Sequence, residues 1–266
     1  IYAIMIFKDY HRSNFLRNVD KIRFRFTGKN IKMGIMQVET NKEISDEDSI
    51  KIVIKDLNKI EKESDTLIID FSKEFKNISK ELEKREVESL VYSLTELKDI
   101  EELEIKVEGQ LYDTYSNSKE KITYPLKRDF GINKTYQFTK TNDISKTVIY
   151  YLEDINDTSY YVPVTKYKND SRDKIDIIVE ELTTGYIYEP NLMSIVREDL
   201  TLLDKSVDDK VMTLNFNDAL FDTTGKIKEE VLYTIGYSIF DNYDVNVISY
   251  QVDNKEVVNL ERQKMS

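Results

Sequence analysis

The sequence contains no cysteine and no tryptophan, and its single histidine is His11. The absence of cysteine excludes disulfides, thiolate metal sites and cysteine nucleophiles within this stretch. One histidine leaves a Ser-His-Asp triad without a plausible base and cannot build a histidine-based zinc site. We therefore expect His11 to be a solvated surface residue.

Glycine and proline are also scarce, with 7 and 3 residues among 266. This scarcity excludes a collagenous or Pro/Gly-rich disordered chain, whereas 40% hydrophobic and 33% charged residues fit a globular protein. The net charge of −11 argues against general nucleic-acid binding, because DNA-binding proteins place Lys and Arg on phosphates. The length predicts about two domains.

Long hydrophobic runs are missing as well. Residues 1–7 (IYAIMIF) are apolar, but a segment that crosses a bilayer needs about 20 such residues. Two interpretations of the N-terminal segment 1–19 stay open. It is either the end of a membrane anchor or signal helix whose earlier part is missing, or a short first strand.

Two parts of the chain repeat one pattern at an offset of 145 residues, without a gap from residue 67 to residue 109. Positions 212, 214 and 216 are apolar and alternate with polar ones, and positions 67, 69 and 71 carry apolar residues at the same spacing of two, which is typical of half-buried strands. A helical pattern and a closing strand follow in both copies. The identical pairs at this offset are Phe71/Phe216, Tyr92/Tyr237, Ser93/Ser238, Asp99/Asp244 and Val107/Val252.

A further helix is expected ahead of each block, over residues 50–57 and 175–182, at an offset of 125. The change of offset implies 20 extra residues in the second copy, between Leu182 and Met212, which we expect to form a loop and one added strand. Strand pairs are expected ahead of the two helices, at residues 22–26 with 31–38 and 148–152 with 160–167.

These elements predict an α+β fold of two tandem small domains, each with two helices packed on one face of a three- or four-stranded sheet. The expected organisation is the N-terminal segment (1–19), a first domain (20–109), a linker rich in Ser, Lys, Thr and Asn (110–146) and a second domain (147–262).

Residues 67–75 and 89–109 resemble the GerM sporulation and germination domain family. In that family a strand ending in Asp-Phe-Ser precedes a helix and then a strand that ends in glycine. The second copy departs from the pattern, with Asn215 in place of the aspartate and Asn254 in place of the glycine. The residues marked as the structural motif of the two copies are Asp70, Phe71, Ser72, Tyr92, Gly109, Asn215, Phe216 and Tyr237.

The resemblance implies a fold like that of ring-building modules and a non-catalytic structural role in the cell envelope of a Firmicute. The protein is expected to support a complex during endospore formation or germination, in the space between mother cell and forespore, in association with a membrane. Expected partners are envelope or sporulation-complex proteins, with self-association as an alternative and without nucleic acid. We expect no catalytic residue, cofactor or metal.

A function of another class stays open, namely a peptidoglycan- or polysaccharide-binding module or a cell-wall hydrolase. Glu101 with Glu102, or Asp70 with Glu74, could supply paired acids, but adjacent acids are common in a chain with 50 Asp and Glu. Ser238 lacks the second glycine of a nucleophile elbow and is expected to be structural. Ordinary strand packing is the expectation for the tyrosines that could otherwise form a sugar platform: Tyr150, Tyr151, Tyr160, Tyr161 and Tyr167.

Overall fold

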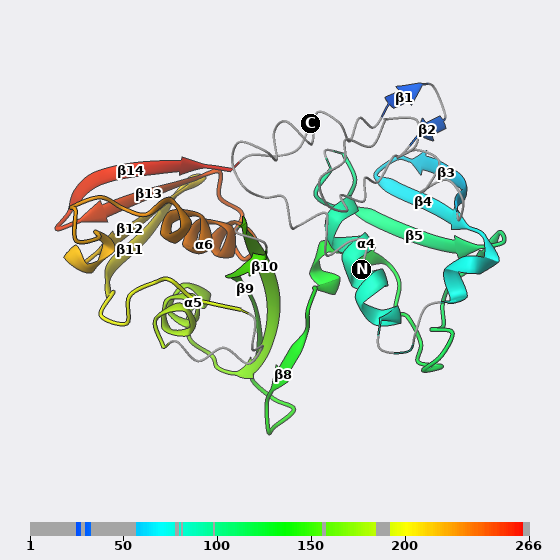
Figure 1. Cartoon of the computed structure of the whole chain (residues 1–266), viewed down its shortest axis with the longest axis horizontal. Coiled ribbons are helices and arrows are strands. Elements are labelled where there is room, and N and C mark those ends of the chain that lie inside the picture. The colour runs from blue at the N-terminus through cyan, green and yellow to red at the C-terminus, as the bar shows by residue number, and fades with distance from the viewer. Residues whose placement is uncertain are drawn as a thin grey trace. The chain divides into compact units, whose positions relative to one another are not determined.

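The computed structural model describes residues 25–27, 30–32, 57–77, 80, 82–97, 99–155, 158–184 and 192–262. The chain forms two compact units, which divide between Ile132 and Asn133 (Figure 1). The expectations for the N-terminal segment and for His11 lie outside the described residues. Among the helices that are described, none has the length and apolar character needed to cross a membrane.

The first unit is built on a sheet with the strand order β3-β4-β5-β6, in which β7 also pairs with β5. Its described helix, α4 (Glu83–Leu94), contributes Val87, Leu90 and Val91 to a core that the sheet residues Leu67 and Ile69 complete. Two further short strands form an antiparallel hairpin. The elements of this unit are β1 (Arg25–Thr27), β2 (Asn30–Lys32), β3 (Leu57–Glu63), β4 (Thr66–Phe71), η1 (Lys73–Asn77), α4, β5 (Glu102–Val107), β6 (Gln110–Leu111), β7 (Leu126–Lys127) and η2 (Arg128–Phe130).

The second unit holds two helices, α5 (Lys174–Thr183) and α6 (Glu229–Phe240), and two sheets. One core joins both helices to both sheets, so β9 and β10 do not extend the four-stranded sheet as the sequence suggested but cover the helices separately (Figure 1). The strands are ordered β8-β10-β9 in one sheet and β11-β12-β13-β14 in the other. The remaining elements are β8 (Thr135–Gln137), β9 (Ile144–Ile155), β10 (Thr158–Asn169), β11 (Leu202–Asp208), β12 (Val211–Phe216), η3 (Asp218–Leu220), β13 (Val247–Val252) and β14 (Lys255–Glu261).

The repeat at 145 residues is reproduced strand by strand. β4 and β5 pair in parallel with Phe71 opposite Val107, and β12 and β13 do the same with Phe216 opposite Val252. The α+β class is therefore confirmed. The expectation that the first copy lacks an added strand is wrong, because β3 stands 145 residues before β11 and carries a register shift at the equivalent place. Leu57 accordingly begins a strand and does not end a helix.

The segment 110–146, expected to be a linker, is instead divided between the two units. Tyr112, Tyr115 and Leu126 are buried in the core of the first unit, and β8 pairs in parallel with β10 of the second. In the first unit β6 and β7 are separate short strands, and each pairs with one end of β5. In the second unit a single strand, β14, pairs along the whole of β13. The irregular spacing of the buried residues explains why the sequence pattern did not reveal them.

Candidate functional site

The Asp-Phe-Ser motif of the first unit lies at the end of β4, beside the turn that joins β5 to β6. The Asp70 carboxylate accepts a hydrogen bond from the Gly109 N–H at 2.9 Å. The turn residues Glu108 and Gly109 have φ of 53° and 75°, a left-handed conformation in which glycine is unstrained. The Phe71 carbonyl accepts from the Glu108 N–H at 2.9 Å, and η1 begins directly after Ser72. These contacts fix the turn to the end of the parallel strand pair.

The second unit builds the same arrangement with different residues. Asn215 stands where Asp70 does, and its side-chain oxygen accepts from the Asn254 N–H at 3.0 Å. Its amide nitrogen donates to the Asn254 side-chain oxygen at 2.9 Å, a bond that a glycine could not accept through a side chain. Asn254 has φ of 60°, which asparagine tolerates better than most residues. We name these two contacts the turn latches: Asp70 with Gly109, and Asn215 with Asn254.

The motif phenylalanines differ in burial. Phe216 is fully enclosed and its ring centroid lies 6.4 Å from that of Tyr250. Phe71 is only partly buried and stacks on Phe75 at 4.3 Å between ring centroids. Both therefore contribute to their cores, Phe216 more completely.

The two motif tyrosines, Tyr92 and Tyr237, lie on helices and take no part in the turn latches. Tyr92 of α4 is 1% exposed, and the Arg128 guanidinium lies 3.9 Å from its ring centroid. The same arginine donates to the Tyr92 carbonyl at 2.8 Å and pairs with Glu96, which attaches η2 to the end of α4. Tyr237 of α6 packs among other tyrosines. Each residue thus joins its helix to a neighbouring segment.

The tyrosines of β9 and β10 serve mainly as packing residues. Tyr150, Tyr151 and Tyr161 are 5%, 0% and 3% exposed. Tyr150 and Tyr161 both contact the Tyr237 ring, so they hold the sheet against α6. The side chain of Tyr160 lies outside the described set. Tyr167 stacks on Tyr136, a residue of β8 that the sequence reading did not single out.

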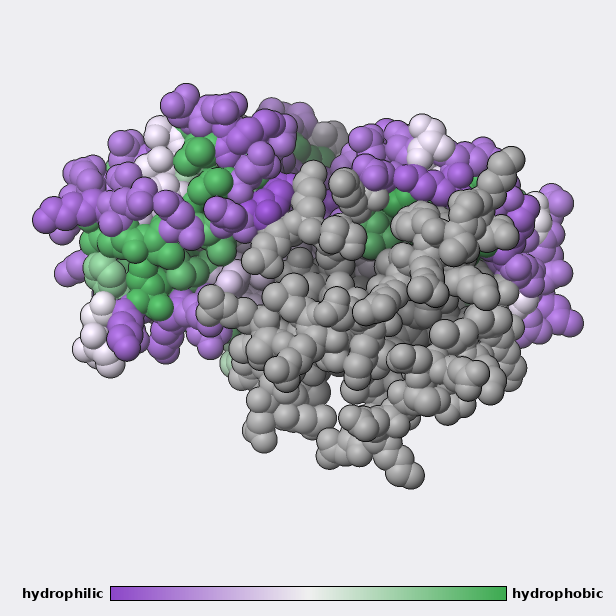
Figure 2. Space-filling view, turned by 90° about the horizontal axis from the view of Figure 1, so that it is seen from above, coloured by the Kyte–Doolittle hydropathy of each residue, from purple (hydrophilic) through white to green (hydrophobic). Residues whose placement is uncertain are grey.

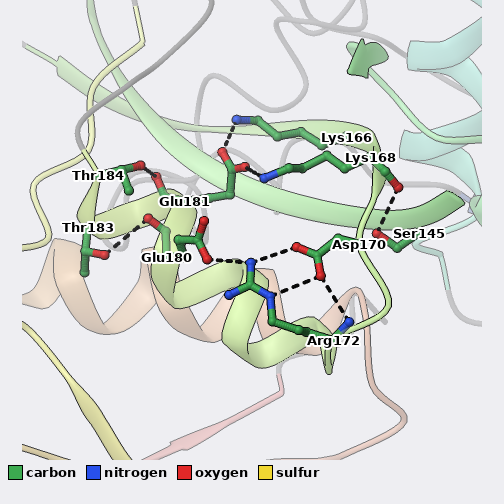
Figure 3. A network of polar contacts seen from close by, with 9 residues as sticks. All are labelled: Ser145, Lys166, Lys168, Asp170, Arg172, Glu180, Glu181, Thr183 and Thr184. Carbon is green, nitrogen blue, oxygen red and sulfur yellow. Dashed lines mark hydrogen bonds and ion pairs between the residues drawn. The ribbon is translucent and has the colours of Figure 1, made fainter. Parts of the chain in front are cut away.

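A network of charged side chains joins α5 to β10 (Figure 3). Glu181 lies between two lysines and bonds to Lys166 at 2.5 Å and to Lys168 at 2.6 Å. The side chains of Lys166 and Glu181 are only 3% and 9% exposed. At the start of the helix Arg172 bridges Asp170 and Glu180 at 2.7 and 2.5 Å. No hydrophobic pattern marks these residues, so they could not be singled out from the sequence.

The electrostatics of this network favour fixed charges. Burial raises the pKa of Glu181, but the hydrogen bonds from Lys166 and Lys168 outweigh it and leave the pKa below its ordinary value. Arg172 lowers the pKa of Asp170 by hydrogen bonding to it. Burial raises the pKa of the Tyr151 hydroxyl. The Glu181 carboxylate is ionised, enclosed and hydrogen-bonded to two lysines, so it is poorly suited to exchange protons with a substrate.

Ser238, considered above as a nucleophile, and the helix-capping residue Asp173 both occupy structural places. Ser238 is buried within α6, donates to the Thr234 carbonyl at 2.7 Å and accepts from the Tyr150 N–H at 2.9 Å. Asp173 caps α5 and accepts from the Ile175 N–H at 3.3 Å. Over the described ranges, no cluster of three or more His, Asp or Glu side chains is placed to hold a metal ion.

Comparisons with known proteins agree on one family. A family model described as "Germane: Sporulation and spore germination" matches residues 51–113 and 148–258. The chain is 33% identical to the spore germination protein GerM of Bacillus subtilis over 215 residues. This aligned region covers 77% of this chain and 58% of that protein. The chain thus spans less than two thirds of the length of this relative.

The fold is similar to a solved structure, the tandem GerMN domains of the sporulation protein GerM from Bacillus subtilis. The TM-score is 0.71 at 30% identity, over 78% of this chain and 77% of the other. The resemblance inferred from the motif residues and the tandem arrangement are thereby confirmed. The chain belongs to the Germane family of sporulation and spore germination proteins.

Proposed function

We propose that the chain is a non-catalytic structural protein that supports a protein complex of the cell envelope during sporulation or germination. The observation that carries the proposal is that the motif residues of both copies are used in internal contacts. Asp70 and Asn215 hold turns, and Phe71 and Phe216 fill cores. A motif used in this way preserves a scaffold, and the function then resides on the surfaces that the scaffold carries.

The family supports the same reading, since the relatives described above are named as sporulation and germination proteins. An extracytoplasmic location, with envelope or sporulation-complex proteins as partners, belongs to this proposal.

The test compares assembly with catalysis. Photo-crosslinking in sporulating cells is expected to trap envelope proteins on the chain, and purified chain is expected to leave peptidoglycan and model glycosides uncleaved. Asp70→Asn is the matched variant, because the second copy carries Asn215 at the equivalent position and the turn latch can form. Hydrolysis by the wild type that falls by about 10²-fold or more in this folded variant would overturn the proposal.

A second candidate, a peptidoglycan- or polysaccharide-binding module, is favoured by one observation. Tyr136 is 63% exposed and its ring stacks on Tyr167 at 5.1 Å between centroids, so a rigid aromatic surface faces solvent. Co-sedimentation with purified peptidoglycan tests it. Binding that Tyr136→Ala abolishes would support this candidate, and equal sedimentation with and without peptidoglycan would remove it.

A further inference from the structure

β11 is an edge strand of the second unit. It stands at the end of the order β11-β12-β13-β14 and, within the described part of the chain, pairs only with β12. A register shift between Leu202 and Asp204 interrupts its start, after which residues 204–208 pair regularly with β12. Along these five residues of regular strand, alternate residues therefore present their backbone N–H and C=O groups at the side of the sheet away from β12. Such an edge can accept a further strand.

This edge carries exposed apolar side chains. Leu203 and Val207 are 53% and 55% exposed, although each is large enough to favour burial. Figure 2 shows hydrophobic side chains gathered on the second unit among hydrophilic ones. Exposed apolar side chains on an unpaired edge are a recurrent feature of protein-binding surfaces.

The first unit supplies an internal comparison. Its edge strand β3 has the same register shift, and Asn58 and Lys62 stand where Leu203 and Val207 do. An exposed ion pair between Lys59 and Glu61 adds further charge to β3. Charged side chains on an edge strand disfavour pairing with other chains. β11 is charged as well, at Asp204, Lys205 and Asp208, but at positions 203 and 207 it exposes apolar side chains where β3 has polar ones.

The charge near β11 indicates what kind of strand it would accept. Asp204, Asp208 and Asp209 carry negative charge along and just beyond the strand. The lysine of β11, Lys205, is bound by Asp176 of α5 at 2.7 Å, so its charge is balanced within the unit. A strand that alternates apolar and basic residues complements both the apolar side chains and the aspartates.

We propose that β11 is a docking edge, to which an extended segment of a partner protein with alternating apolar and basic residues adds as a fifth strand. Backbone hydrogen bonds supply affinity, Leu203 and Val207 contact the apolar residues, and the aspartates select the basic ones. The inference rests on the proposed scaffold function and names one of its surfaces. It concerns only the second unit.

The first experiment uses the full 266-residue chain and a synthetic peptide in which Lys and Val alternate. Calorimetry is expected to detect binding, and amide hydrogen exchange is expected to slow in β11 but not in β14, the opposite edge. The variant Leu203→Asn/Val207→Lys installs the residues of β3 and is expected to weaken binding at least about tenfold, or ~1.4 kcal/mol. Its thermal midpoint should match the wild type, since these side chains are exposed.

The second variant, Asp204→Lys/Asp208→Lys, is expected to lose the Lys-Val peptide and gain binding of a Glu-Val peptide. Added salt should weaken wild-type binding, because exposed charges are screened. The inference is overturned by absent peptide binding, by binding that both variants retain, or by protection elsewhere than β11. It is also overturned if the wild type dimerises and Leu203→Asn/Val207→Lys is monomeric, since a second copy would then occupy the edge. Crosslinks to envelope proteins through other surfaces would leave the proposed function standing.

Discussion

Removing the Glu181 carboxylate tests whether the buried charges of the second unit stabilise it. The substitution Glu181→Leu leaves Lys166, whose side chain is 3% exposed, without its partner at 2.5 Å. Breaking a buried pair by deleting one member typically costs about 3–5 kcal/mol. Lys168 is less affected, because 23% of its side chain is already exposed to water. We therefore expect Glu181→Leu to be strongly destabilised.

The other variants separate charge from packing. Lys166→Met should cost clearly less, since Glu181 keeps Lys168 at 2.6 Å. The double variant Lys166→Met/Glu181→Leu removes both buried charges and should come within about 1 kcal/mol of the wild type, because apolar replacement of a buried pair is often neutral. Three variants thus have a defined order of stability.

Urea unfolding followed by circular dichroism measures these free energies, and amide hydrogen exchange assigns the change to the second unit. With a slope of about 2 kcal/mol/M, Glu181→Leu should lower the midpoint by roughly 1.5–2.5 M. If the single and double variants are equally unstable, lost packing accounts for the effect and the electrostatic reasoning is refuted. A Glu181→Leu variant as stable as the wild type refutes it too.

Three further predictions concern the scaffold. Gly109→Asn should be nearly neutral, since Asn254 holds the equivalent left-handed position with φ of 60°, whereas Gly109→Val should cost about 1–2 kcal/mol in urea unfolding. Burial raises the pKa of Glu83, but hydrogen bonds from Ser118 and Asn117 outweigh it and hold the pKa below its ordinary value of 4.5. The stabilisation that these bonds supply is therefore present above that ordinary value and is lost as pH falls through the lowered value. The thermal midpoint of Glu83→Gln should therefore fall less than that of the wild type as pH is lowered below 5. Phe216→Ala should lower the free energy of unfolding by about 3–5 kcal/mol, and Phe71→Ala should lower it less, because Phe71 is only partly buried. Equal urea midpoints for these two variants would contradict this.

The parts of the fold with a hydrophobic period were predictable from the sequence. β12 alternates apolar and polar residues, β4 carries apolar residues at the equivalent positions, and the register of these strands with β5 and β13 follows the offset of 145 residues. β3 was missed because its sequence is LNKIEKE, and over residues 58–63, whose burial is described, Ile60 is the one buried apolar residue among polar and charged ones. An edge strand needs little burial, so it leaves little periodic signal.

The candidate site was predictable only in part. The motif marked both replacements in the second copy, Asn215 for the aspartate and Asn254 for the glycine, but it did not reveal that the two residues bond to each other in the turn latch. The Lys166–Glu181 pair was unpredictable, because charged residues on β10 and α5 read as solvated until their burial is known. Long-range contacts of this kind depend on packing that local sequence does not encode.

The differences between the copies lie where two related scaffolds can acquire different surfaces. The turn latch and the parallel strand pair are kept in both units. In the first unit, residues 112–125 replace the continuous course of β14, and the buried carboxylate of Glu83 fixes this segment through the backbone N–H groups of Asn117 and Ser118, each at 2.8 Å.

The edge strands differ in the same way, because the exposed Leu203 and Val207 of β11 are replaced by Asn58 and Lys62 at the equivalent positions of β3. Two identical copies would strengthen binding to one repeated ligand through effective concentration. Copies that keep the core and differ at the edge strand do not share a docking surface. Because β3 carries polar residues at the positions of Leu203 and Val207, the divergence favours a protein in which the second unit alone accepts a strand at its edge.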